Sequence, residues 1–104
     1  MEVHFFDETI ERFIYSLEKP TVAKVLRTLN LLERFSHELG MPHSKKISLN
    51  IFELRIRGIQ EIRFLYTFYR QKILILHGFI KKSNKVPTRE LQIALKKRSA
   101  LDRI

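Results

Sequence analysis

Two runs in the middle of the chain, residues 52–57 and 61–68, alternate apolar and polar side chains. Alternation with a period of two is typical of strands that bury one face. A third run, residues 73–76, is apolar at every position, which favours a central strand covered on both faces. Because the connections between the runs are short, the three strands are predicted to be antiparallel neighbours in a meander.

Helical spacing precedes these strands. Apolar side chains recur at intervals of three and four within residues 8–18, which predicts an amphipathic helix. A second helix is expected from Pro20, with Gly40 placed to end it. We expect the two helices to form an antiparallel hairpin that lies on the sheet.

Three further segments complete the expected order. Residues 2–6 are typical of a short strand, residues 41–48 are expected to form a loop, and a last helix is expected after Pro87. The predicted fold class is α+β, with the order β-α-α-β-β-β-α: an antiparallel meander packed against an N-terminal two-helix hairpin and followed by a C-terminal helix. The length of 104 residues predicts one domain over residues 1–104.

Charge changes this picture, because 20 Lys and Arg outnumber 11 Asp and Glu and give a net charge of +9. Residues 1–40 carry a balance of −2 and residues 41–104 a balance of +11. Such polarity favours a polyanionic partner, with nucleic acid ahead of an acidic protein and a membrane surface third. No apolar run approaches the length of a membrane span, and no signal-peptide pattern begins the chain, so we expect a cytoplasmic protein without a membrane partner.

Several kinds of chemistry are excluded. The absence of cysteine rules out disulfides and thiolate metal sites, and the four histidines are too scattered to predict a metal centre. There is no glycine-rich phosphate loop and no nucleophile elbow around a serine. Cleavage of RNA without a metal or cofactor remains possible, because it needs only groups that move protons and cations that stabilise the phosphorane.

The candidate residues for that reaction gather on the polar face of the meander and just after it. An arginine-rich sheet face with lysines at its edge suits a phosphate backbone. The predicted catalytic residues are Arg55, Arg63, His77, Lys81 and Lys82, and the predicted RNA-binding residues are Lys45, Lys46, Glu53, Arg57 and Lys85. For any one arginine a solvated surface position is the competing interpretation. His77 suits a hydrogen-bonded core histidine equally well, and Tyr66 falls on the buried face, which favours a packing role.

Residues 51–56 and 62–66 resemble the ELR and RxxY core of the RelE/ParE toxin superfamily. Residues 76–87, LHGFIKKSNKVP, are similar to the signature of its HigB-like, phage-derived branch. Glu90 and Ala94 match the pattern of the helix that follows this signature. The similarity covers essentially the whole chain.

This resemblance implies a RelE-like fold and a toxin of a type II toxin–antitoxin pair. Members of the branch are similar to mRNA interferases, metal-independent endoribonucleases that enter the ribosomal A site and inhibit translation by cutting the message. Arg55 and Arg63 would then contact substrate phosphate, and Lys81 and Lys82 match the basic pair after the third strand. The implied partner is a helix-turn-helix antitoxin. Relatives differ in their general base, so that role stays open.

Two other functions stay open as well. The ParE side of the superfamily contains toxins that inhibit gyrase by binding, although the Lys81–Lys82 signature argues against this. The chain could alternatively be a non-catalytic module that binds nucleic acid or an antitoxin.

Overall fold

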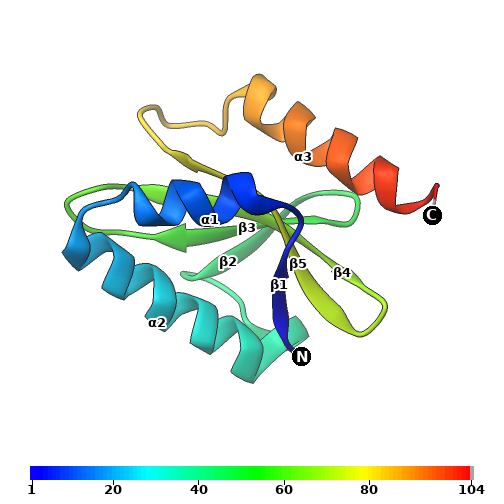
Figure 1. Ribbon diagram of the computed structural model, residues 1–104, viewed down its shortest axis with the longest axis horizontal. Helices are drawn as coiled ribbons and strands as arrows, with labels where there is room; N and C mark the ends of the chain where they lie inside the picture. Colours follow the sequence, from blue (N-terminus) through cyan, green and yellow to red (C-terminus); the bar gives the residue numbers. More distant parts are fainter. Residues whose placement is uncertain (104) are drawn as a thin grey trace.

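The computed structural model describes residues 1–103 and confirms the α+β fold class, in an order consistent with a RelE-like fold (Figure 1). The helices are α1 (Glu8–Tyr15), α2 (Lys19–Phe35) and α3 (Thr88–Leu101), with a 3-10 turn, η1 (Ser36–Glu38), after α2. The strands are β1 (Val3–Phe5), β2 (Ser44–Ser48), β3 (Ile51–Ile56), β4 (Ile62–Tyr69) and β5 (Lys72–Ile80). They form one mixed sheet in the order β1-β5-β4-β3-β2.

The predicted meander is present as β3, β4 and β5, which pair antiparallel in sequence order. Strand β5 is also central, as predicted, because β1 pairs with its other side in parallel. Its run from Ile73 to Leu76 sends side chains alternately into the packing on either face of the sheet. An apolar run without alternation therefore identified the strand with helices on both sides.

The predicted loop over residues 41–48 is wrong in its second half. Residues Ser44–Ser48 form β2, an edge strand that pairs antiparallel with β3. This segment, SKKIS, has only one apolar residue, so it lacks the alternation by which a strand is detected. Two kinds of contact stabilise this strand. Its backbone pairs with that of β3, and the buried Ser44 hydroxyl forms a hydrogen bond of 2.6 Å with the Tyr66 hydroxyl.

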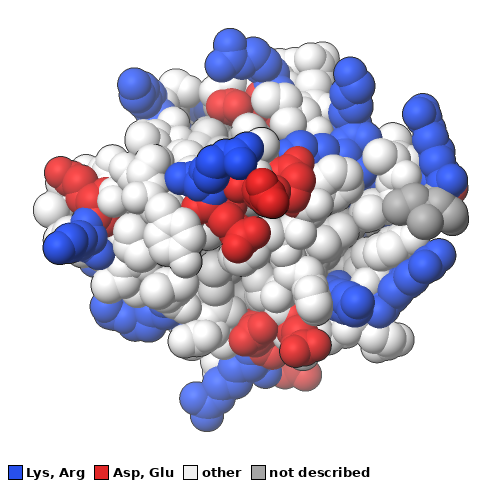
Figure 2. Space-filling view, viewed as in Figure 1, with Lys and Arg blue, Asp and Glu red and all other residues white. Residues whose placement is uncertain are grey.

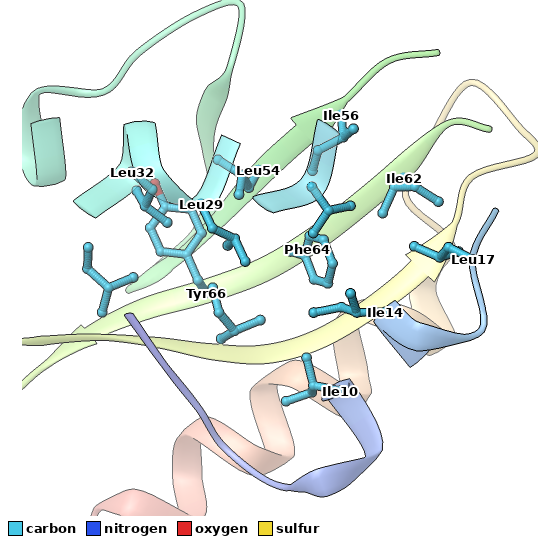
Figure 3. Packing of buried hydrophobic residues seen from close by; sticks show 13 residues of the cluster. Ile10, Ile14, Leu17, Leu29, Leu32, Leu54, Ile56, Ile62, Phe64 and Tyr66 are labelled. Atoms are coloured by element: carbon cyan, nitrogen blue, oxygen red, sulfur yellow. The ribbon is translucent and has the colours of Figure 1, made fainter. Parts of the chain in front are cut away.

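The main core lies between the sheet and the first two helices (Figure 3). Helix α1 contributes Ile10 and Ile14, and α2 contributes Leu29 and Leu32, to the same face as Phe64 of β4. The Asp7 side chain caps the first turn of α1 by accepting a hydrogen bond from the Thr9 amide. The apolar faces predicted for the hairpin and for the meander thus meet each other.

Helix α3 covers part of the opposite face. A second cluster forms there from Ile51, Leu65, Leu76, Phe79 and Ala94, one residue of which comes from α3. A salt bridge of 3.0 Å between Lys97 Nζ and Asp7 Oδ2 connects α3 to the segment before α1. Because α3 does not extend over the whole face, the polar side chains of β2 and β3 are left beside it, and the candidate site lies there.

Replacing Gly78 by alanine is expected to destabilise the fold. A Cβ at this position would lie 2.7 Å from Cε1 of Phe64 and 2.9 Å from Cδ2 of Phe13, inside the main core. Overpacking of this kind costs about 1–3 kcal/mol. Urea unfolding measures the loss, and Gly40→Ala is the matched control because no atom lies within 4 Å of its added Cβ. Equal unfolding midpoints for the two variants would contradict the packing described here.

Candidate active site

A cleft of about 440 Å³ opens between the β2–β3 edge of the sheet, the loop after β5 and the start of α3. Five of its lining residues are cationic, and one is acidic. The lining residues are Lys45, Lys46 and Ile47 from β2, Glu53 and Arg55 from β3, Lys81, Asn84, Lys85 and Val86 from the loop, and Leu91 from α3. Seven of the ten predicted site residues come from these same elements, and six of them line this cleft.

Arg55 is the cleft arginine, and a buried carboxylate holds it. Its Nε donates to Oε1 of Glu53 at 2.8 Å, and the two side chains are 16% and 3% exposed. Both residues point to the same face of β3 because they are two apart on the strand. The rest of the guanidinium keeps donors for an anion, since a guanidinium carries five N–H groups in a planar fork.

Arg63 lies beneath the cleft rather than on its wall. It sits opposite Arg55 on β4, is 2% exposed, and has Nε 3.6 Å from Oε2 of Glu53. One terminal nitrogen donates to the Ile62 carbonyl at 3.0 Å and the other to Oε1 of Glu61 at 3.4 Å. The structure gives Arg63 no exposed surface for the predicted phosphate contact. Its connection to the cleft passes through Glu53, whose carboxylate it shares with Arg55.

The two adjacent lysines of the signature have different surroundings. Lys81 is partly buried and lines the cleft, and its amide donates to the Glu61 carbonyl at 2.7 Å. Lys82 is exposed and is not among the lining residues. Lys85, also predicted, lines the cleft together with Asn84, which was not among the predicted site residues. The KKSNK loop therefore contributes its first and last lysines and the asparagine between them.

His77 lies at the contact between the sheet and α3. The pairing of β4 with β5 shifts at Leu65, which leaves Leu76 as an extra residue on β5. This bulge turns both Leu76 and His77 towards α3, where His77 Nε2 lies 2.8 Å from Oε1 of Glu90. His77 does not line the cleft, so its placement fits a hydrogen-bonded packing histidine.

Arg57 and Tyr66 also lie away from the cleft. Arg57 follows the end of β3 and lines a second hollow beside α2. Tyr66 is 1% exposed in the main core, as its position in the alternating pattern predicted. Burial raises the pKa of the Tyr66 hydroxyl above its ordinary value, although the hydrogen bond with Ser44 acts the other way. At neutral pH the hydroxyl therefore stays protonated and serves packing and hydrogen bonding.

Charges of both signs are mixed on the face that Figure 2 shows. A group of acidic side chains lies near its middle with a basic side chain beside it, and lysines and arginines project at several places around the outline. The cleft, by contrast, places five cations around one carboxylate that is already paired with two guanidiniums. An anionic ligand would meet an unbalanced positive field in the cleft.

Within residues 1–103, no group of three His, Cys, Asp or Glu side chains is arranged to hold a metal ion. The same residues contain no helix that is both long and apolar enough to cross a membrane. Among curated proteins, none matches the sequence. The family described as "Phage derived protein Gp49-like (DUF891)" matches residues 12–99. This range includes all the residues that line the cleft and the two strands, β2 and β3, that contribute to it.

Proposed function

Because the chain belongs to the phage-derived Gp49-like family, which is associated with toxin–antitoxin toxins, we propose that it is a type II toxin that cuts messenger RNA on the ribosome. The observation that carries the proposal is the cleft in which Arg55 is fixed by a buried carboxylate and surrounded by four lysines. A cytoplasmic protein with a helix-turn-helix antitoxin as its partner belongs to the same proposal.

The reaction asks little of the protein beyond charge and position. The ribose 2′-OH attacks the adjacent phosphorus and loses its proton, and the 5′-oxygen of the next nucleotide leaves as it gains one. Arg55 and Lys81 are placed to stabilise the charge that develops on the phosphorane oxygens. Lys45, Lys46 and Lys85 would hold the neighbouring phosphates. The products are a 2′,3′-cyclic phosphate and a free 5′-hydroxyl.

The lysine ammonium groups of the cleft are the candidates for donating a proton in this reaction. Glu53 is engaged by Arg55 and Arg63, and His77 is engaged by Glu90 outside the cleft. The lining residues that keep an ionisable group free of a carboxylate within residues 1–103 are the lysines. An ammonium group can protonate the leaving 5′-oxygen. We leave the base that accepts the 2′-OH proton unassigned.

The test is message cleavage in a cell-free translation extract, mapped by primer extension. Purified protein is expected to cut translated message at discrete positions and to leave the same RNA intact without ribosomes. DNA supercoiling by gyrase, measured with the same preparation, should be unaffected. Inhibited supercoiling with intact message would instead support a gyrase-directed toxin, and salt-dependent RNA binding without cleavage would support a non-catalytic module.

The adjacent lysines give a matched pair of variants. Lys81→Ala is expected to lower the cleavage rate by about 10-fold to 100-fold, because it removes a cation that faces the scissile phosphate. Lys82→Ala should change the rate by less than about threefold, because an exposed charge outside the cleft acts only through the general field. The rates are measured in the translation extract. Equal losses in both variants would mean that Lys81 has no special place in the reaction.

A further inference from the structure

A second hollow lies on the other side of Arg55, between α2, the segment before β2 and the end of β3. Its volume is about 310 Å³. The lining residues are Lys24, Arg27, Thr28 and Leu31 from α2, Pro42 and His43, and Arg55, Ile56 and Arg57. Arg55 lines both this α2 hollow and the cleft, so the two sites adjoin at that residue.

The charged side chains that line the α2 hollow are all cationic. Lys24, Arg27 and Arg57 are exposed, no carboxylate lines the hollow, and none of the three is in a salt bridge within residues 1–103. The Lys24 ammonium donates to the Arg57 carbonyl at 3.2 Å, which holds the two residues together across the hollow. Three cations that lie together without a carboxylate partner create a positive field that favours an anion.

The lining of the hollow also has an apolar part. Leu31 and Ile56 belong to it, together with Pro42, which is followed by His43 in the segment before β2. A flat apolar group with an attached anion satisfies both parts, and an unstacked nucleotide has that composition. Proteins that read single-stranded RNA stack bases on aromatic side chains, histidine among them, or on guanidinium planes, and place phosphates on cations. His43 and the arginines of the hollow are side chains of these two kinds.

We propose that the α2 hollow is a nucleotide subsite, which binds the RNA residue next to the scissile phosphate held at Arg55. This deepens the proposed function, on which the role of Arg55 rests. The strand would pass from the lysines of the cleft over Arg55 to Arg57, Arg27 and Lys24. The volume of about 310 Å³ is at the lower end of the range for ligand sites, about 300–1,000 Å³, and so suits one nucleotide.

The test uses a short single-stranded RNA that is 2′-O-methylated throughout and therefore cannot be cleaved. Its dissociation constant is measured by fluorescence anisotropy across a series of salt concentrations. Lys24→Ala/Arg27→Ala is expected to weaken binding by about fivefold to 20-fold and to reduce the slope of log K against log salt by about 1.4, or 0.7 per lost phosphate contact. Arg27→Ala alone, which breaks no hydrogen bond or salt bridge within residues 1–103, should give about half of that change in slope.

The matched control is Lys72→Ala/Lys96→Ala. It removes the same net charge from two exposed positions that line neither the cleft nor the α2 hollow. Its affinity should fall by less than about twofold. Equal losses in the two double variants would overturn the subsite, because binding would then follow net charge alone. An unchanged RNA affinity combined with lost capture of the co-expressed antitoxin would also overturn it, by assigning the hollow to a protein partner.

Measuring message cleavage and RNA binding together distinguishes failure of the proposed nuclease function from failure of the proposed nucleotide subsite. If wild-type protein cuts message but the Lys24/Arg27 variant binds RNA like the control, the subsite is wrong and the nuclease stands. If wild-type protein binds the methylated RNA through Lys24 and Arg27 but cuts no message, the subsite stands and the nuclease is wrong. Failure of the wild-type protein to bind the RNA even at low salt would remove the subsite.

Discussion

Arg55→Ala is expected to slow message cleavage by about 10²–10³-fold, the loss found when one fixed donor to a transition-state oxyanion is removed. The reason is that Arg55 is the one guanidinium that lines the cleft, and Glu53 already holds it in place at 2.8 Å. Such a group stabilises new negative charge without the cost of reorienting during the reaction. Rates of cleavage in the translation extract measure the effect.

Two further variants sharpen this prediction. Arg55→Lys keeps the charge but loses the planar fork, so we expect it to recover only part of the rate. Arg34→Ala removes an arginine of α2 that lines neither the cleft nor the α2 hollow, and this variant should cleave message at the wild-type rate. Cleavage by Arg55→Ala within about threefold of wild type, in a variant whose unfolding midpoint is unchanged, would remove the cleft from the proposed reaction.

Glu53→Gln is expected to be the most destabilising single change in the site, at about 3–5 kcal/mol, because it removes the buried carboxylate beside the buried Arg63 guanidinium and leaves only the more exposed Glu61 near it. Arg63 is 2% exposed, and its Nε makes no hydrogen bond but lies 3.6 Å from Oε2 of Glu53, within ion-pair distance. Glutamine has nearly the shape of glutamate, so the loss reports charge more than volume. Urea unfolding with an unchanged m-value would measure it.

The control for this change is Glu61→Gln. Glu61 also contacts Arg63, at 3.4 Å, but its side chain is 42% exposed, so water replaces it at a cost below about 1 kcal/mol. The double variant Glu53→Gln/Arg63→Met should recover much of the stability, because it removes the stranded charge as well. If Glu53→Gln and Glu61→Gln unfold at the same urea concentration, the buried pair does not hold the floor of the cleft.

Much of the fold follows from local pattern. Alternation placed Leu54 and Ile56 in the main core and put Glu53 and Arg55 together on the other face. The same parity put Arg63 on the face of Arg55, and the pairing of β3 with β4 makes the two direct neighbours. A period of two is a property of the backbone, so it is readable wherever one face of a strand is buried.

What the sequence could not supply depends on neighbours from elsewhere in the chain. The alternating pattern predicted the face of the sheet on which Arg63 lies, but not how deeply its side chain is buried. The burial depends on Arg55 and Phe79, which flank it on the neighbouring strands. His77 depends on a bulge, and one extra residue reverses the side to which everything after it points. Strand β2 depends on the open edge of β3, since its own sequence is mostly polar.

The α2 hollow was missed for a related reason. Lys24 and Arg27 lie three residues apart on α2, and polar residues along a helix are typical of an ordinary solvated face. Only the folded chain brings them beside Arg57, which follows a strand more than 25 residues later. Positive charge is visible in a sequence, but its convergence requires the tertiary structure.

Strand β2 ends the sheet, and its outer backbone groups face no other strand within residues 1–103. An unpaired edge strand can form backbone hydrogen bonds with the edge strand of a second copy of the same chain, and such pairing leads to aggregation. Here β2 carries two exposed lysines, Lys45 and Lys46, one on each face of the sheet, so two copies paired along this edge would bring four ammonium groups near one another. The positive charge to which we assign RNA binding is thus also expected to oppose edge-to-edge association of folded molecules.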